Sequence, residues 1–352
     1  MAFRARASLN RCLFSLGLLY LYFVHLPLLR VLGPVCALML TRATSLGTWL
    51  LTSVGIGKDV REAMRQVVPQ IRPDLSVSGV LRRYWMIKQE QFALEAVFST
   101  VRGRQFVERV SRQVVGREYL DAAVENGRGV IVAIFHFGIV RVTFSALLSI
   151  GYDSYFHAVR AEGYADRSFD FVARAVMNRK VQIEKSTGRK VIYHKPGETF
   201  KRIAELLRSN AIVMVGGDGM AGSRFVELPF LSGTMSFPTG LAGLAAETGA
   251  AIVCLFPVRE SMTRHRCVLH PPIYCNDRSQ ASIEAAVRAY VRIFEENVRQ
   301  FPWMWWSWRR IAVEQKPGRR AKFVVKGTPT EATRYYTDDK EATAGETRPL
   351  GR

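Results

Sequence analysis

The pattern of apolar and polar positions divides the chain into three parts. Residues 1–45 contain a mostly apolar stretch, and residues 46–312 combine helical apolar spacing with short β-type runs. Residues 313–352 are rich in Lys, Arg, Thr, Gly and Glu and have few apolar positions. We therefore expect an N-terminal apolar segment, a globular domain with an α/β core at about 115–312, and a disordered basic and polar tail.

The apolar run over residues 12–29 has about the length that a helix needs to cross a bilayer, roughly twenty residues. Arginines precede it, so the positive-inside rule keeps the N-terminus in the cytoplasm. A single crossing would place the basic remainder of the chain outside, against the same rule. An interfacial or re-entrant hairpin bent at Pro27 and Pro34 avoids this conflict and is favoured. A secretory signal is less favoured, because no small-residue cleavage site follows before Arg42.

Within residues 59–99 the apolar spacing predicts helices, the first of them stopped by Pro69. Further along, short apolar runs alternate with helical stretches, which predicts a largely parallel or mixed sheet covered by helices on both faces. The fold class is therefore α/β. The expected strands are residues 129–135, 153–158, 190–193, 211–215, 251–256 and 266–273, and the helices between or after them are 141–150, 168–179, 199–209, 237–248 and 280–299.

His136 stands at the end of the buried run 129–135, and the helical pattern resumes soon after it. Gly138 permits a tight turn between the two elements. Strand-to-helix connections are where α/β proteins gather ligands and catalytic groups. An imidazole at this place serves as a general base near neutral pH. The structural alternative is a packed, hydrogen-bonded core histidine.

A glycine-rich GxGxxG sequence occupies residues 217–222, directly after a predicted strand. A dinucleotide-binding fingerprint requires a helix to open within the motif, whereas residues 223–232 are predicted to be irregular and contain Pro229. We therefore reject a Rossmann site. Two interpretations remain: a loop whose backbone amides face a phosphate together with Arg224, and a plain surface turn.

Other catalytic classes lack their signatures. No GxSxG nucleophile elbow is present. His265, Cys267 and His270 alternate along a strand-like segment, but no second cluster completes a metal site, so no metal is expected. The five cysteines are odd in number and lack CxxC spacing, which favours a reduced compartment.

The formal net charge of +20 predicts an acidic partner: a nucleic acid, an anionic lipid surface or an acidic protein. No helix-turn-helix, RRM or zinc-finger pattern is present, and the apolar N-terminus also argues against nucleic acid. An anionic membrane surface is the partner that agrees with the apolar segment.

Several segments, in chain order, resemble the lipid A biosynthesis acyltransferase family, which includes lauroyl and myristoyl transferases and mycobacterial phosphatidylinositol mannoside acyltransferases. The resembling segments are residues 81–84, His136-Phe137-Gly138, 217–219, 227–233, 238–240, 250–257 and 303–310. The resemblance implies a glycerolipid-acyltransferase-like mixed sheet with a membrane-associated N-terminal segment. It also implies an acyltransferase of the bacterial inner membrane whose catalytic domain faces the cytoplasm.

What the resemblance implies about chemistry is acyl transfer from a thioester donor, acyl carrier protein or acyl-CoA, to a hydroxyl of a lipid or glycolipid, without a further cofactor. His136 would act as the general base. In the family the fifth residue after this histidine is Asp or Glu, but this chain has Arg141 there. A guanidinium has no hydrogen-bond acceptor and cannot orient the imidazole. Another carboxylate is therefore expected, with Glu227 preferred and Asp218 second.

Arg141 is then expected to bind a substrate phosphate or to pair with the carboxylate. Gly138, Arg224 and Arg189 complete the predicted substrate-binding residues. Two alternatives remain open: a family branch with a different acceptor, and an inactive homologue that binds lipid or acyl carrier protein. The tryptophans within residues 303–310 suit either a bilayer headgroup zone or a closed core.

Overall fold

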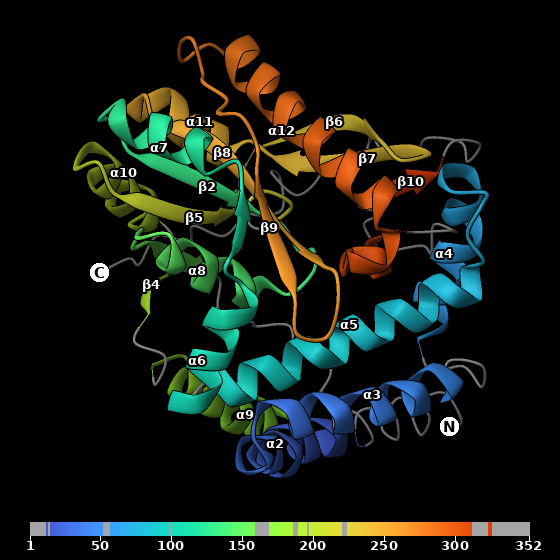
Figure 1. Ribbon diagram of the computed structural model, residues 1–352. Coiled ribbons are helices and arrows are strands. Elements are labelled where there is room, and N and C mark those ends of the chain that lie inside the picture. The colour runs from blue at the N-terminus through green and yellow to red at the C-terminus, as the bar shows by residue number, and fades with distance from the viewer. Residues whose placement is uncertain are drawn as a thin grey trace, which may run out of the picture.

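A computed structural model gives the architecture of the chain (Figure 1). It describes Cys12 and residues 15–51, 57–98, 100–158, 169–185, 189–195, 197–219, 224–311 and 323–325. The basic residues 1–11 and the predicted disordered tail, apart from residues 323–325, lie outside the described residues.

The centre of the protein is a seven-stranded sheet in the order β1-β9-β8-β2-β5-β3-β4. All neighbouring strands run parallel except β8 and β9, which form an antiparallel pair. The strands are β1 (Gln113–Val115), β2 (Val130–Ile134), β3 (Tyr155–Ala158), β4 (Lys190–Tyr193), β5 (Ile212–Gly216), β8 (Ala251–Arg259) and β9 (His265–Leu269).

Helices cover both faces of this sheet (Figure 1), so the predicted α/β fold with a mixed sheet is confirmed. Successive side chains of β2 alternate between two buried clusters: Ile131 and Ala133 face one, and Val130 and Val132 face the other. The covering helices are α7 (Arg117–Glu125), α8 (Val140–Ser149), α9 (Asp170–Lys185), α10 (Thr199–Arg208), α11 (Gly240–Thr248) and α12 (Gln280–Gln300).

The expectation that residues 223–232 are irregular is wrong. β6 (Phe225–Phe230) and β7 (Gly233–Pro238) form an antiparallel hairpin, and β10 (Phe323–Val325) pairs with the other side of β7. Pro229 is tolerated because β6 is an edge strand, where a missing N–H breaks no ladder. The chain thus leaves the glycine-rich sequence into a strand and not into a helix.

The prediction that Pro69 stops the first helix is also wrong, because α4 (Lys58–Ile71) runs through it. Pro69 lies in the last turn, so the helix continues only two residues beyond it, and the buried Val67 and Val68 hold the helix on the core. Two further helices follow before the sheet: α5 (Val77–Phe98) and α6 (Val101–Val110).

The N-terminal apolar stretch forms a π-helical turn η1 (Leu21–His25), α2 (Leu26–Leu32) and α3 (Pro34–Leu51). Gly33, with φ of 77°, breaks the path between α2 and α3. By length and composition, the helix over Ser15–Leu32 is sufficient to cross a membrane, with a mean hydropathy of 1.6 and 33% of it buried. α3 packs along α5 (Figure 1), so this region is joined to the globular domain.

Many large apolar side chains of this region are exposed, which is unusual for the surface of a soluble domain. They are Leu16, Tyr20, Phe23, Val24, Leu28, Val31, Leu32, Val35, Met39, Leu46 and Leu50.

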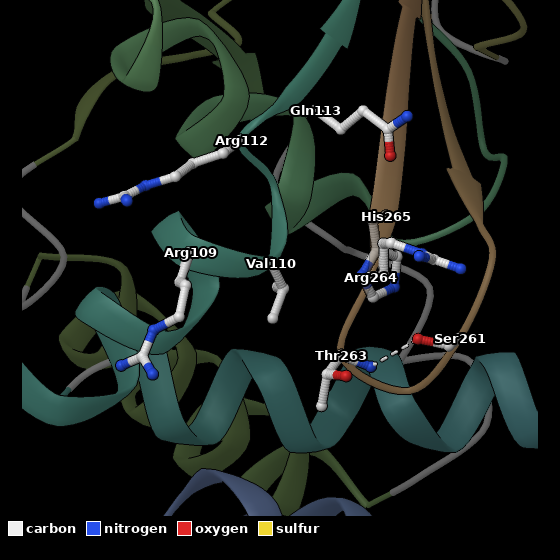
Figure 2. A pocket seen from close by; sticks show the side chains of 8 residues that line it. All are labelled: Arg109, Val110, Arg112, Gln113, Ser261, Thr263, Arg264 and His265. Atoms are coloured by element: carbon white, nitrogen blue, oxygen red, sulfur yellow. Dashed lines mark hydrogen bonds between the residues drawn. The ribbon is translucent and has the colours of Figure 1, made fainter.

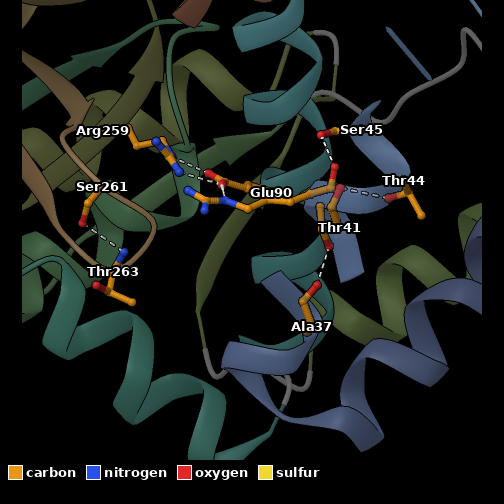
Figure 3. A network of polar contacts seen from close by, with 9 residues as sticks. Ala37, Thr41, Thr44, Ser45, Glu90, Arg259, Ser261 and Thr263 are labelled. Carbon is orange, nitrogen blue, oxygen red and sulfur yellow. Dashed lines mark hydrogen bonds and ion pairs between the residues drawn. The ribbon is translucent and has the colours of Figure 1, made fainter. Parts of the chain in front are cut away.

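A buried ion-pair network links three elements beneath the sheet (Figure 3). Glu90 on α5 accepts two hydrogen bonds from the guanidinium of Arg259, the last residue of β8, one of them 2.8 Å long from Nη2 to Oε1. Arg42 on α3 approaches the same carboxylate at 3.8 Å. Burial raises the pKa of Glu90, opposed by Arg259 and Arg42. The network ties the N-terminal helices to the end of a central strand.

Candidate active site

His136 and Asp218 meet at the carboxyl edge of the central sheet. β2 ends at Ile134 and its neighbour β5 ends at Gly216, so each residue comes two positions after its strand. Nδ1 of His136 lies 2.9 Å from Oδ1 of Asp218, and the backbone N–H of His136 donates to the same oxygen at 3.1 Å. The carboxylate therefore holds both the ring and the main chain of the histidine.

The two side chains differ in exposure: 44% for His136 and 0% for Asp218. An ionised carboxylate only accepts hydrogen bonds, so the proton of a neutral imidazole belongs on Nδ1 in this contact. Nε2 then carries the lone pair, on a ring that is open to solvent. This is the tautomer that a general base requires.

The backbone on either side of His136 is fixed by residues near the end of the described chain. The N–H of Trp306 donates to the carbonyl of His136 at 2.7 Å, and the N–H of Gly138 donates to the carbonyl of Met304 at 2.8 Å. Phe137 and Trp305 form the antiparallel bridge between these two bonds. The indole of Trp306 meets the imidazole edge to face, with ring centroids 6.2 Å apart.

Two glycines of the site lie where a side chain would collide. Gly138 has φ of 57°, and a Cβ there would lie 2.3 Å from the carbonyl oxygen of Pro257. At Gly217 a Cβ would lie 2.7 Å from the ring of Phe135. Both turns therefore need glycine for close approach, and Gly138 also needs it for its backbone conformation.

The structure brings Asp218, and not Glu227, to the imidazole. Glu227 is exposed on β6, opposite Ser236 of β7, and no interaction described in the structure joins it to His136. The sequence places Glu227 and Asp218 in one region but does not show that β5 pairs with β2. That pairing is what selects Asp218.

The three predicted arginines lie in different surroundings. Arg141 is buried, with 7% exposure, in the first turn of α8, directly after the histidine loop. Arg224 is exposed at the start of β6, and its carbonyl accepts from the N–H of Thr239.

Arg189 precedes β4, at the amino end of a strand whose carboxyl end lies at the edge that holds the site. Its guanidinium carbon lies 4.7 Å from the ring centroid of Phe98 and 4.0 Å from that of Phe144. Arg141 thus follows the His136 loop directly, whereas Arg189 lies at the amino end of β4, at the edge of the sheet opposite to the one that holds His136.

Residues of α5 that the sequence did not single out as site residues surround Trp306. The hydroxyl of Tyr84 donates to the carbonyl of Trp306 at 3.3 Å, and the ammonium of Lys88 lies 4.8 Å from its ring centroid. Trp305 and Trp308 are fully buried, which resolves the sequence alternative in favour of core packing for these two. The tyrosine lies within the family-like segment 81–84, the only signal that pointed to it.

A histidine pair lies further along the same edge of the sheet. His157 is the last residue but one of β3 and His194 follows β4, with ring centroids 5.6 Å apart. Burial, and then the neighbouring His194, lower the pKa of His157 to about 4. Among the described residues no group of three or more His, Cys, Asp or Glu side chains is placed to hold a metal ion.

The chain is similar to known acyltransferases. The sequence model of the bacterial lipid A biosynthesis acyltransferase family matches residues 17–310. Two phosphatidylinositol mannoside acyltransferases, from two strains of Mycobacterium tuberculosis, are each 25% identical over 244 residues. These alignments cover 68% of this chain and 71% of each relative.

Proposed function

We propose, for a chain that belongs to the bacterial lipid A biosynthesis acyltransferase family, that His136 and Asp218 form the catalytic pair of a membrane-bound enzyme. The family and its relatives establish the protein as an acyltransferase with a lipid acceptor. The observation that carries the proposal is the 2.9 Å contact between a half-exposed imidazole and a buried carboxylate at a strand-to-helix turn.

In the proposed reaction, Nε2 of His136 removes the proton from an acceptor hydroxyl. The hydroxyl oxygen attacks the carbonyl carbon of the acyl thioester, and the resulting tetrahedral intermediate collapses with cleavage of the C–S bond. The imidazolium returns its proton to the thiolate leaving group. Asp218 keeps Nδ1 protonated throughout and stabilises the imidazolium by its negative charge.

Arg141 acts on a substrate and not on His136. It occupies the position in which the family motif has a carboxylate, and it lies in the first turn of α8, five residues after His136 in the chain. A guanidinium binds phosphate oxygens through paired hydrogen bonds. We assign it to a phosphate of the acceptor or of the donor. Gly138, in the turn after His136, and Arg224, directly before β6, are the further substrate-binding residues of this proposal.

The donor in this proposal is acyl carrier protein or acyl-CoA, and the acceptor is a membrane lipid or glycolipid. Both donors are acidic or carry phosphate, which agrees with the net charge of +20. The exposed apolar side chains of η1, α2 and α3 support attachment to the cytoplasmic face of a bacterial inner membrane. The acceptors named for the mycobacterial relatives, phosphatidylinositol mannosides, belong to the panel of acceptors to be tested.

The test is acyl transfer by the purified full-length protein, with acyl carrier protein thioesters or acyl-CoA as donors and total membrane lipid as acceptor. Transfer to a lipid that is lost in His136→Ala supports the proposal. Transfer that persists in His136→Ala removes the histidine from the mechanism. Donor and lipid binding without transfer by the unaltered protein would identify an inactive homologue.

A further inference from the structure

A second polar site lies at the hairpin between β8 and β9 (Figure 2). The pocket is formed where the end of α6 and the start of β1 face this hairpin, and three of its residues are arginines. The lining residues are Arg109, Val110, Arg112, Gln113, Ser261, Thr263, Arg264 and His265. None of them belongs to the catalytic pair.

His265 is the unusual member of this pocket. It is 1% exposed, and neither ring nitrogen has a hydrogen-bond partner. Burial, and then the positive charge of Arg259, lower the pKa of His265 to about 3, so the ring is neutral at physiological pH. A neutral imidazole carries one donor and one acceptor, and leaving both unpaired in the interior is unfavourable. A polar ligand in the pocket would supply the missing partner.

The three arginines give the pocket a positive charge. Arg112 pairs with Glu108 at 3.7 Å and Arg264 with Glu260 at 3.0 Å, in both cases as exposed or partly exposed pairs, whereas no acidic partner is described for Arg109. In Figure 2 the side chains of Arg109 and Arg112 extend to the left and that of Arg264 to the right. Exposed ion pairs contribute little, so these long side chains are free to turn onto an anion.

The pocket is adjacent to the catalytic edge of the sheet. Gly138, two residues after His136, packs against the carbonyl of Pro257 on β8. Arg259 is two residues further along this strand, about 7 Å at 3.3 Å per residue. Its partner across the antiparallel ladder is His265. The pocket therefore lies at the same edge of the sheet as the histidine loop.

We infer that the pocket lined by Arg109, Arg264 and His265 binds a phosphate group of one of the two substrates of the acyl transfer. The inference rests on the proposed function for the role of that phosphate but not for its binding. Guanidinium groups and hydroxyls such as those of Ser261 and Thr263 are the groups that proteins use for phosphate, and a neutral imidazole donates to it. The phosphate belongs either to a coenzyme A or phosphopantetheine donor or to the headgroup of the acceptor lipid.

Equilibrium binding to the full-length protein, in detergent for the soluble probes and after detergent removal for the vesicles, tests this without requiring turnover. The donor probes are coenzyme A and pantetheine, which lacks phosphate. The acceptor probes are phosphatidylcholine vesicles, whose headgroup phosphate is neutralised by choline, with and without the anionic lipid phosphatidylinositol. The variants are the double substitution Arg109→Ala with Arg264→Ala, and His265→Phe. The matched control is Arg292→Ala, which removes a guanidinium that is 81% exposed on α12.

We expect the double variant to weaken binding of one anionic probe, coenzyme A or phosphatidylinositol, about tenfold and His265→Phe to weaken it several-fold, with pantetheine and the net-neutral phosphatidylcholine unaffected. Arg292→Ala stays within twofold of the unaltered protein. A loss confined to coenzyme A identifies the donor phosphate, and a loss confined to phosphatidylinositol identifies the lipid headgroup. Equal affinity of the double variant and Arg292→Ala for both probes overturns the inference, whether or not the protein transfers acyl chains.

Discussion

Two buried carboxylates, Asp218 and Glu90, show how the same chemical group serves different ends in this fold. Each has an almost fully buried side chain and each holds a basic partner. The partner of Glu90 is Arg259, whose side chain is only 9% exposed, and Arg42, whose side chain is 47% exposed, adds a third charge at 3.8 Å. The partner of Asp218 is an imidazole that is 44% exposed. The pair in which both side chains are buried, Glu90 with Arg259, holds helices and a strand together and is called the closed pair below. The pair in which one side chain is half-exposed, Asp218 with His136, orients a reactive group and is called the open pair.

The largest effect is expected at His136, the half-exposed partner of Asp218. His136→Ala is expected to lower kcat by about 10³-fold or more, because it removes the proposed general base. The side chain is half-exposed and fills no core space, and the backbone N–H of residue 136 still donates to the buried Asp218, so the melting temperature should fall only slightly. Steady-state kinetics and a melting curve measure both effects. A variant that keeps its kcat, or that loses activity only because it unfolds, would contradict the assignment.

Asp218→Asn tests the carboxylate of the open pair. The amide keeps the shape but loses the negative charge that fixes the imidazole tautomer, so kcat is expected to fall about 100-fold. Glu227→Gln is the matched control, because this exposed carboxylate makes no described contact with His136, and its kcat should stay within twofold. The opposite pattern, with Glu227→Gln impaired and Asp218→Asn active, would return the role to Glu227.

Glu90→Gln tests the closed pair, the buried pair of Glu90 and Arg259. Removing the charge leaves the buried guanidinium of Arg259 uncompensated, and a loss of about 3 kcal/mol in the free energy of unfolding is expected. The kcat of the folded fraction should be retained, since Glu90 contacts no reacting group. Chemical denaturation gives the first quantity. In the control Glu205→Gln, which breaks an exposed pair with Arg202, the change should stay below about 0.5 kcal/mol.

The smallest effect concerns pH. His265 has a folded-state pKa of about 3, below the unfolded value of 6.5, so the unfolded chain binds a proton first as the pH falls. Stability is therefore unaffected above pH 6.5 and declines between 6.5 and about 3. From pH 7 to pH 5 the loss from this group is about 2 kcal/mol. His265→Phe should flatten the decline in denaturation curves measured across this range; an unchanged slope would exclude the histidine as its cause.

Much of the fold follows from local sequence pattern. β2 is recognisable because six consecutive buried apolar residues stand between a glycine and His136, and the helical spacing of α8 follows soon after. The edge hairpin of β6 and β7 escaped prediction because Pro229 normally excludes a strand, and only its place at a sheet edge permits it. The run of α4 through Pro69 likewise depends on core contacts beyond the local pattern.

By itself, the sequence determined the α/β class, the position of His136 at a strand end, the glycine turn after it and the family resemblance. Only the tertiary structure decided which carboxylate meets the imidazole, because Asp218 is 82 residues away and reaches it through the pairing of β2 with β5. The tertiary structure also decided that Trp306 binds the backbone of His136 and that Glu227 is exposed. Spacing along a chain specifies strands and helices, but the order of strands in a sheet is set by how all the apolar faces pack together.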